Sequence, residues 1–362
     1  HERFYPMYNL QQQYVEKFLI DAATQNPRID PRWQSRVTGI ELEDAGASLS
    51  ITTPGGPYTL HARHVIAADG ARSVVRRELG LPLKGDAYEG CYVIADVRMA
   101  SSYPTERRAF FDSPGNPGST VLVHRQPDDI WRIDYQLQVG ASEAEALDEA
   151  NVRRRVGVII DMIGEKAPWE LEWWSLYKAY TLALEDYRHG PVLFVGDAAH
   201  LVPIFGVRGL NSGLADAMNA AWKLAYVIRG WAPERLLASY SPERRGATLE
   251  VFELAAKSTK FMTPPTRGYR LMRDAALALA VHTDLTRPLI NPRQSQPYTY
   301  AESPLTGFAP RDREFSAGPC AGAPLINRRL EDGGFLLDRL GTGFSGLYFA
   351  SSGVLPAALA AL

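Results

Sequence analysis

The sequence is poor in cysteine, has no excess of either charge and contains no long apolar run. Its two cysteines, Cys91 and Cys320, lie far apart and match no CxxC or metal-ligand spacing, so neither a disulfide framework nor a metal site is expected. The net charge of -2 lacks the basic excess of proteins that bind nucleic acids or anionic membranes. No segment approaches the ~20 apolar residues of a transmembrane helix, and no signal-peptide pattern is visible. These absences predict a cytoplasmic protein with no nucleic-acid or membrane partner.

The 362 residues exceed one typical compact core and suit two domains, with a fragment of a third. Hydrophobic residues make up 46% and charged residues 22%, which is ordinary for a globular protein and compatible with a sizeable core. Because the chain begins at His1 rather than at a methionine, we expect the numbering to start inside a longer protein.

Periodicity divides the first 80 residues into a helix, a β-meander and a buried strand. Apolar residues recur at helical spacing between Gln11 and Ala23, and Asn26-Pro27 ends this helix. Turn signals rich in glycine and proline then separate short β-like runs. The predicted strands are Val37–Glu43, Leu49–Thr53, Tyr58–Ala62 and the apolar run His64–Ala68, and a helix follows with Ser73 as its N-cap.

The next hundred residues are typical of antiparallel strands. The predicted strands are Cys91–Met99, Arg107–Phe111, Ser119–His124 and Asp129–Val139. In the last of them, apolar residues from Trp131 to Leu137 alternate with polar ones from Arg132 to Gln138, which predicts one buried and one polar face. A surface-exposed helix is predicted at Glu143–Gly164, with Ser142 as its N-cap.

Helices dominate the remainder of the chain. A short apolar strand, Val192–Val195, precedes a long helix whose apolar residues recur from Leu214 to Ile228. Further helices are predicted at about 233–261 and 269–283, before a Pro-rich connector at 288–324. Gly346–Ala350 and Val354–Leu362 suggest the first strand and helix of a further domain.

The strongest functional signal directly follows the strand Val192–Val195. It consists of Gly196-Asp197-Ala198-Ala199-His200, Pro203, Gly206, Gly209, Asn211, Asp216, Asn219 and Trp222-Lys223. A carboxylate at the end of a strand can accept hydrogen bonds from a sugar-like polyol, and glycines let the backbone approach a flat ring. A helix N-terminus near 209–213 presents free N–H groups and a positive dipole end, which favours the negative charge of a reduced flavin. An ordinary surface loop would not need the whole run.

A second motif also directly follows an apolar strand, and it begins 128 residues before Asp197. Its sequence is Asp69-Gly70-Ala71-Arg72-Ser73-Val74-Val75-Arg76. An Asp-Gly pair alone is more often a turn than a site. With Arg72, Ser73 and Arg76 in place, the basic groups could face phosphates.

Together, the two motifs resemble those of the class A flavoprotein monooxygenases, the group of para-hydroxybenzoate hydroxylase and phenol hydroxylase. The segment Trp131–Leu137, and Tyr240 with Glu243-Arg244-Arg245, resemble the members that act on phenols and phenolic acids. The resemblance extends to about residue 305, and the tail resembles the start of the thioredoxin-like C-terminal domain of some members. It implies an α/β fold, in which a Rossmann-type FAD-binding domain carries an inserted, mostly antiparallel substrate-domain sheet and C-terminal helices.

The expected domain boundaries follow from this resemblance. They are 1–83 and 186–287 for the FAD-binding domain with its helices, 84–185 for the substrate domain, 288–324 for the connector and 325–362 for the thioredoxin-like part.

The resemblance also implies an activity. The protein would be an FAD-dependent, NAD(P)H-consuming monooxygenase that uses O2 to hydroxylate a phenolic or related aromatic substrate through a flavin C4a-hydroperoxide. The protein's own part would be to exclude water and to activate the phenol toward phenolate. No nucleophile or metal ligand stands out, so no catalytic residue is assigned, and a homodimer remains open.

By the same resemblance, Asp197 binds the ribityl chain of FAD, while Asp69 and Gly70 lie between the pyrophosphate region and the NAD(P)H groove. Gln12, four residues before Glu16, stands where the family has a flavin-contacting glutamine, although an exposed helix glutamine fits this position equally well. The remaining cofactor-binding residues expected are Pro203, Gly206 and, lining the flavin ring, Gly209, Leu210 and Asn211.

The sequence also departs from the family pattern. Pro203 is followed by Ile204 instead of a second proline, which keeps a carbonyl but loses rigidity, and Arg208 stands where relatives often have Gln or Lys. The family opens with a strand, a GxGxxG turn and a helix that holds the pyrophosphate, and this segment is missing from the sequence. We expect that residues upstream of His1 are omitted from the numbering.

Two other functions remain open. One is a related flavin enzyme, an epoxidase or a polyketide hydroxylase, because the motifs indicate the cofactor and not the substrate. The other is a non-catalytic, degenerate flavin fold, which the missing segment and Ile204 favour slightly, whereas the nearly complete motif at 196–223 argues against it. Weaker substrate-contact candidates are His124, Arg132, Tyr135 and Gln136, while His200 and Arg153-Arg154-Arg155 are more simply structural.

Overall fold

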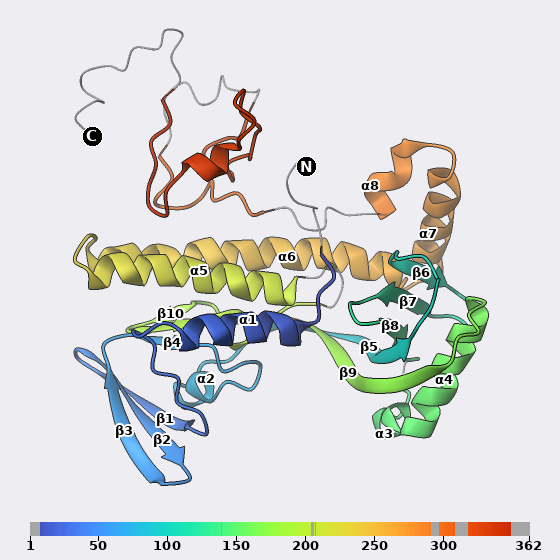
Figure 1. Ribbon diagram of the computed structural model, residues 1–362, viewed down its shortest axis with the longest axis horizontal. Helices are drawn as coiled ribbons and strands as arrows, with labels where there is room; N and C mark the ends of the chain where they lie inside the picture. Colours follow the sequence, from blue (N-terminus) through green and yellow to red (C-terminus); the bar gives the residue numbers. More distant parts are fainter. Residues whose placement is uncertain are drawn as a thin grey trace.

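A computed structural model of the chain describes residues 8–138, 140–203, 206, 208–290, 297–307 and 318–348. These residues form three β-sheets and a pair of long helices that run side by side across the molecule (Figure 1). Within these ranges, no helix is both long and apolar enough to cross a bilayer.

The N-terminal part is a helix followed by a β-meander, as predicted. Helix α1 spans Gln12–Thr24, and strands β1 (Arg36–Glu43), β2 (Gly46–Thr53) and β3 (Gly56–Ala62) pair in the antiparallel order β1-β2-β3. The apolar side chains of α1 are not buried, however, since the helix contains no buried residue.

A small central sheet joins segments that are far apart in the sequence. Strand β11 (Val192–Phe194) runs parallel to β4 (Val65–Ala67) and antiparallel to β10 (Arg188–His189). Helix α2 (Val74–Glu78) follows β4, and the Ser73 hydroxyl accepts a hydrogen bond from the Arg76 N–H, which confirms the predicted N-cap. Both predicted apolar strands are therefore neighbours in a parallel pair.

The large sheet has six strands in the order β12-β9-β5-β8-β7-β6. They are β5 (Lys84–Met99), β6 (Arg108–Phe111), β7 (Thr120–Arg125), β8 (Ile130–Gln136), β9 (Trp169–Ala183) and β12 (His200–Leu201). Four of these strands were predicted. Strand β9 was missed, although it pairs with β5 over nearly its full length, because a register shift between Asp96 and Val97 interrupts the alternation along the pair.

One face of this sheet packs against helices. The predicted helix Glu143–Gly164 is two helices, α3 (Glu143–Leu147) and α4 (Glu149–Met162), because Asp148 leaves helical geometry and caps the second one. Helix α4 is also not simply exposed, since Val152, Val156, Ile159 and Ile160 are buried against the sheet.

The remaining helices include the two long ones seen in Figure 1, α5 (Gly209–Ile228) and α6 (Tyr240–Met262). Around them lie η2 (Glu234–Ser239), α7 (Arg267–Ala280), η3 (Asp284–Thr286), α8 (Arg287–Ile290) and η5 (Leu336–Arg339). The main core of the parallel sheet includes Tyr187, Phe194, Leu237 and Tyr240. Gly346–Tyr348 is irregular rather than extended, and the rest of that predicted strand and the helix Val354–Leu362 lie outside the described residues.

Candidate functional site

The two sequence motifs meet in the structure. Strands β4 and β11 are parallel neighbours, so the residues that follow them emerge at the same edge of the sheet, where ligands bind in open α/β folds. The Val195 N–H donates to the Ala67 carbonyl at 3.0 Å. The Arg76 guanidinium links the motifs directly, because Nη1 donates to the Ala198 carbonyl at 2.9 Å and Nη2 to the Ala71 carbonyl at 2.6 Å.

Asp197 projects from this edge as an unpaired carboxylate. Its side chain is exposed, and no described residue donates a hydrogen bond to it. Partial enclosure by the protein raises the pKa of Asp197, and the nearby His200 opposes this shift. The backbone behind it is tight, since Gly196 has φ +56° and a Cβ on Gly213 would lie 3.3 Å from the Gly196 Cα. The turn therefore packs against α5 and leaves the carboxylate free to accept hydrogen bonds from a ligand.

The loop between β12 and α5 continues the site. Pro203 and Gly206 are buried, and Gly206 has φ +104° in a place where a Cβ would come within 2.4 Å of the Arg208 Nε. Helix α5 begins at Gly209, so the N–H groups of its first turn have no acceptor inside the helix. Leu210 and Asn211 in this turn are exposed. Ile204, Phe205 and Val207 lie outside the described residues, so the predicted effect of Ile204 stays a prediction.

The Asp69-Gly70 motif has local structural roles. The Asp69 Oδ2 accepts a hydrogen bond from the Val75 N–H at 3.1 Å, and Gly70 has φ +78°. The basic group proposed to face phosphates is partly occupied, because the Arg76 guanidinium bonds two backbone carbonyls, while Arg72 is exposed. Gln12 lies exposed at the start of α1 and donates to Glu16 at 2.7 Å.

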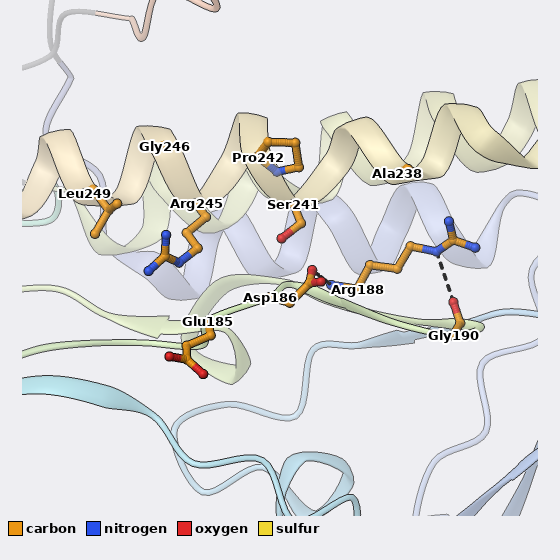
Figure 2. A pocket seen from close by; sticks show the side chains of 10 residues that line it. All are labelled: Glu185, Asp186, Arg188, Gly190, Ala238, Ser241, Pro242, Arg245, Gly246 and Leu249. Carbon is orange, nitrogen blue, oxygen red and sulfur yellow. Dashed lines mark hydrogen bonds between the residues drawn. The ribbon is translucent and has the colours of Figure 1, made fainter. Parts of the chain in front are cut away.

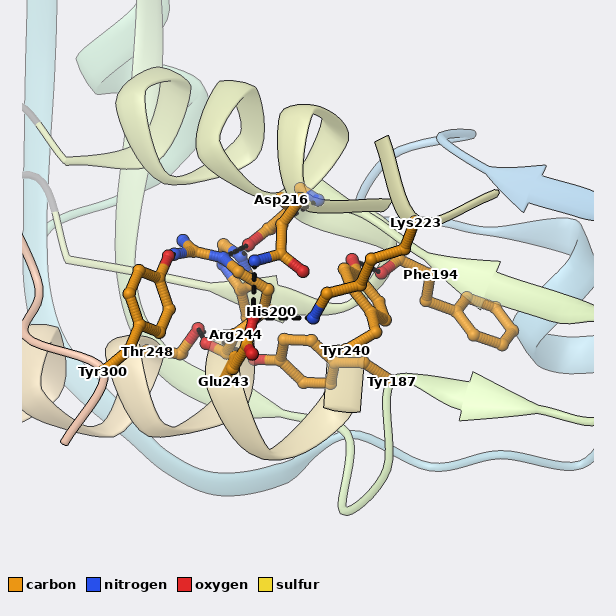
Figure 3. Close-up of polar contacts among 12 residues, drawn as sticks. Tyr187, Phe194, His200, Asp216, Lys223, Tyr240, Glu243, Arg244, Thr248 and Tyr300 are labelled. Atoms are coloured by element: carbon orange, nitrogen blue, oxygen red, sulfur yellow. Dashed lines mark hydrogen bonds and ion pairs between the residues drawn. The ribbon is translucent and has the colours of Figure 1, made fainter. Parts of the chain in front are cut away.

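A buried polar network lies next to the edge of the sheet where β4 and β11 end (Figure 3). Asp216 of α5 is fully buried and accepts hydrogen bonds from the Gly196 N–H at 3.0 Å and from the Arg244 Nε at 2.7 Å, and it contacts the His200 Nε2 at 2.7 Å. The His200 ring stacks on Tyr187 with ring centroids 5.8 Å apart. His200 is therefore a structural residue, as the sequence indicated.

The network continues to a second buried carboxylate. Glu243 of α6 accepts hydrogen bonds from the Lys223 Nζ at 2.6 Å, the Asn219 Nδ2 at 2.7 Å and the Ser303 hydroxyl at 2.6 Å. Burial lowers the pKa of Lys223, which the partner Glu243 opposes. The connector contributes again through Tyr300, whose hydroxyl accepts from the Arg244 Nη1 at 2.7 Å.

Sequence reasoning found these residue positions but not this role. Asp216, Asn219 and Lys223 were parts of the first motif, and Glu243 and Arg244 were parts of the resemblance. Their spacing on α5 and α6 places them on the facing sides of the two helices, but the partners Tyr300 and Ser303 lie beyond any local pattern.

The weaker candidates on the large sheet lie on opposite faces. Tyr135 belongs to the apolar core beneath α4, and burial raises its pKa to about 12. His124, Arg132 and Gln136 point to the other face of the sheet, because cross-strand partners project to the same side. From Arg132 to Gln136, the side chains that β8 places on this second face are polar, as predicted, and they are buried or half-buried.

A pocket of about 660 Å³ lies between α6 and the turn before β11 (Figure 2). Arg188 of β10 and the flanking residues Asp186 and Gly190 line one wall, and Ser241 and Arg245 of α6 line the other. The residues of the first wall precede β11, whereas Asp197 follows it. The pocket is therefore not the place where the motif residues gather.

Comparison with known proteins identifies the family. A family model described as an FAD binding domain matches residues 1–255, which is more than half of the chain. The chain belongs to this FAD binding domain family. Its cofactor is FAD, and the residues fit this group: Asp197 has no hydrogen-bond donor among the described residues and could accept from ribityl hydroxyls, and the positive end of the α5 dipole suits the electron-rich edge of a flavin ring.

The relatives are named as hydroxylases. A 3-(3-hydroxy-phenyl)propionate/3-hydroxycinnamic acid hydroxylase of Mycolicibacterium smegmatis is 26% identical over 349 residues, covering 92% of this chain and 58% of the relative. A hydroxylase of the same name from Burkholderia vietnamiensis is 30% identical over 270 residues, covering 74% of this chain and 48% of the relative. The chain thus spans about half the length of these relatives.

Solved structures agree in fold. The p-nitrophenol 4-monooxygenase PnpA from Pseudomonas putida matches with a TM-score of 0.67 and 27% identity, covering 78% of this chain and 71% of that one. The flavin-dependent monooxygenase PieE, solved with FAD and substrate, matches with a TM-score of 0.74 and 24% identity, covering 92% and 64%. The α/β architecture with an inserted antiparallel sheet is thereby confirmed as that of the class A FAD aromatic hydroxylases.

Proposed function

We propose that the protein is an FAD-dependent monooxygenase that hydroxylates a phenolic or related aromatic compound with O2 and NAD(P)H. The observation that carries the proposal is the edge where β4 and β11 end. There, an unpaired carboxylate, a glycine-rich loop and a helix N-terminus converge, and a buried network holds them in place. Membership of the FAD binding domain family and the names of the relatives support the same function.

Each group has a distinct task in this proposal. The chemistry that bound FAD would supply is acceptance of a hydride from NAD(P)H and activation of O2, so that one oxygen atom would be transferred to an electron-rich ring and the other would leave as water. Asp197 binds and orients the cofactor, and Gly206, Gly209, Leu210 and Asn211 shape the surface against its ring. Pro203 completes this loop, and Gln12, Asp69 and Gly70 are further proposed contacts of the cofactor or of NAD(P)H.

The proposed substrate is a small phenol or phenolic acid. The names of the relatives support this size, because 3-(3-hydroxyphenyl)propionate carries one ring and one hydroxyl group. A larger polyketide is the second candidate, and one structural match favours it: the OxyS anhydrotetracycline hydroxylase has a TM-score of 0.65 at 25% identity. Comparing one-ring and fused-ring phenols as stimulants of NAD(P)H oxidation distinguishes these two classes.

The first test is an absorption spectrum of the purified protein before and after addition of FAD. The proposal requires the two-banded spectrum of oxidised flavin, followed by phenol-dependent oxidation of NAD(P)H and formation of a hydroxylated product. A folded protein that takes up no flavin would show a degenerate, non-catalytic scaffold and sink the proposal. Sedimentation of the same sample reports whether the proposed homodimer forms.

A further inference from the structure

The large sheet has two chemically different faces. Directly opposed residues on neighbouring strands project to the same side, so the strand register assigns each side chain to a face. Tyr135 and its partners Val93 and Val121 point into the apolar core beneath α4. Asp134, the next residue along β8 toward its start, points to the opposite face together with its partner Leu122.

This opposite face is turned toward the loop between β12 and α5. The hydroxyl of Tyr177 on β9 donates to the Val202 carbonyl at 2.6 Å, and Val202 lies between β12 and Pro203. On the next strand, the register partner of Tyr177 is Tyr92, whose hydroxyl lies 2.8 Å from the Thr263 Oγ1 at the end of α6. This face of the large sheet is therefore in contact with the loop that precedes α5 and with the end of α6.

Three side chains on this face have unused hydrogen-bonding capacity. Asp134 is 4% exposed and His124 is 8% exposed, yet the Asp134 Oδ1 and the His124 Nδ1 have no hydrogen-bond partner among the described residues. No hydrogen bond or ion pair links Arg107 to a described residue either. The neighbouring Arg132 differs, since it makes a two-point ion pair with Asp96 at 2.8 and 2.7 Å. Unsatisfied buried polar atoms of this kind call for a missing partner.

The charges of the cluster define what this partner can be. Burial raises the pKa of Asp134 to about 6, although Arg132 and Arg107 oppose the shift. Burial, with Arg107 and Arg132, lowers the pKa of His124 to about 3, so its imidazole is neutral. Desolvation lowers the pKa of Arg107, and the nearby Asp134 opposes this shift, although the residue as a whole is exposed.

We infer that Asp134, His124 and Arg107 hold the ring hydroxyl group of the aromatic substrate, with Asp134 as the acceptor of its proton. This inference rests on the proposed hydroxylase function. A phenolic hydroxyl has one O–H for the Asp134 Oδ1 and lone pairs for the N–H groups of Arg107 and neutral His124. A carboxylate group of the substrate would fit this position less well than a hydroxyl group, because it has no proton to donate to Asp134 and would bring a second negative charge beside it.

The position suits the reaction. Successive rows of side chains on one face of a strand lie about 7 Å apart, roughly the length of a phenol molecule. A ring bound by its hydroxyl at Asp134 therefore extends toward the Tyr92 and Tyr177 row beside the loop between β12 and α5. When the O–H bond breaks, the proton moves to the Asp134 Oδ1 and the electron pair stays on the phenolic oxygen. That electron pair raises the electron density at the ring carbon that receives one oxygen atom of O2. NAD(P)H supplies the two electrons that reduce the other oxygen atom to water.

The test compares two ligands that differ only in the hydroxyl group, 3-(3-hydroxyphenyl)propionate and 3-phenylpropionate, on the FAD-loaded protein. Calorimetry from about pH 5 to about pH 8 should show that the hydroxylated ligand binds about 10-fold more tightly where Asp134 is ionised. This advantage should shrink as the pH falls below about 6, because a protonated carboxyl is a weaker acceptor. Asp134→Asn should remove the pH dependence and lower the turnover of a phenol about 100-fold or more.

Asp96→Asn is the matched control. It removes a buried carboxylate from the same face, but one whose oxygens are already bonded to Arg132. The charged and titratable groups that interact with Asp134 are Arg132 on its own strand, Asp96 and Tyr92 on β5, and Arg107 before β6. His124 on β7 lies on the same face, opposite Arg132. Asp96→Asn should lower the free energy of unfolding, yet keep the hydroxyl advantage and its pH dependence.

Three outcomes overturn the inference. The first is an Asp134→Asn variant that keeps the hydroxyl advantage and its pH dependence, and the second is a wild-type protein that binds FAD but shows no advantage. The third is wild-type affinity for 3-phenylpropionate that rises as the pH falls through about 6 and loses this rise in Asp134→Asn, which assigns the cluster to a carboxylate. The flavin absorbance of each sample separates these results from failure of the proposed function, since a protein without FAD binding refutes the latter.

Discussion

The protein contains two kinds of carboxylate. Those that hold the fold together are saturated: Asp216 and Glu243 are buried, and each has three polar partners supplied by the protein. Those proposed to bind a ligand are not: Asp197 has no donor among the described residues, and the Asp134 Oδ1 lacks a partner there although Asp134 is buried. The number of partners, rather than burial alone, separates structural acids from functional ones.

The contrast has a physical basis. A buried carboxylate is stable only when hydrogen bonds and opposite charges replace its lost hydration. Around Asp216 and Glu243, the protein supplies Arg244 and Lys223 for this purpose. Where the chain leaves an oxygen without a partner, the folded state is less stable than it could be, and a ligand can supply what is missing.

The largest effect is expected for a saturated carboxylate. Asp216→Asn should lower the free energy of unfolding by about 3–5 kcal/mol, because it leaves Arg244 buried without its counter-charge. Urea denaturation of the flavin-free protein measures this loss. Asp161→Asn is the control, since its ion pair with Lys166 is exposed and should contribute less than about 1 kcal/mol. Equal losses in the two variants would contradict the comparison.

The second effect concerns cofactor affinity. Asp197→Ala should weaken FAD binding about 10- to 100-fold, the contribution of hydrogen bonds to a charged acceptor, and leave the stability of the flavin-free protein unchanged. Fluorescence titration with FAD and thermal melting give the two quantities. Asp69→Ala is the contrasting variant, because the Asp69 carboxylate accepts a hydrogen bond from the Val75 N–H in the first turn of α2, and its loss should cost about 1 kcal/mol of stability. A destabilised Asp197→Ala protein would place Asp197 among the structural acids.

The third effect has the opposite sign. Because the pKa of Asp134 is raised to about 6 in the folded protein, the folded state favours the protonated carboxyl. The free energy of unfolding is therefore highest at low pH and decreases as the pH rises through about 6. Ionisation therefore destabilises the protein by about 3 kcal/mol at most, and Asp134→Asn should stabilise it at neutral pH but not near pH 4. Denaturation curves at both pH values test this, and a variant destabilised at neutral pH would refute it.

The smallest effect is expected at the edge of the network around Asp216 and Glu243. Tyr300→Phe removes the hydroxyl that accepts from Arg244 and should lower stability by about 1 kcal/mol. Tyr298→Phe is a close control, because no described residue makes a hydrogen bond with its hydroxyl. If both variants melt alike, the connector does not contribute to the network through Tyr300.

The sequence predicted much of the local structure. The turn signals located the β-meander, and Ser73 was confirmed as the cap of α2. The two motifs, which begin at Asp69 and at Gly196, proved to be spatial neighbours. These features depend on short-range rules of turn chemistry, capping and strand order. The family and fold class were confirmed as well, because the residues of a long motif are specific in combination.

Features that depend on distant segments escaped sequence reasoning. Strand β9 was missed because a bulge breaks its alternation, and Asp148 divides a helix that periodicity continued. The covered polar face around Asp134 could not be foreseen, since α6 reaches it from 130 residues beyond. The partners Ser303 and Tyr300 likewise come from a connector without regular structure.

The hydrogen bonds of Tyr300 and Ser303 have a consequence for the limits of the autonomous folding unit. The family match ends at residue 255, but the guanidinium of Arg244 and the carboxylate of Glu243 are completed only by residues near 300. A polypeptide shortened to the matched length would admit water to its interior at these two groups. We therefore expect a fragment that ends at residue 255 to be less stable than one that extends through Ser303.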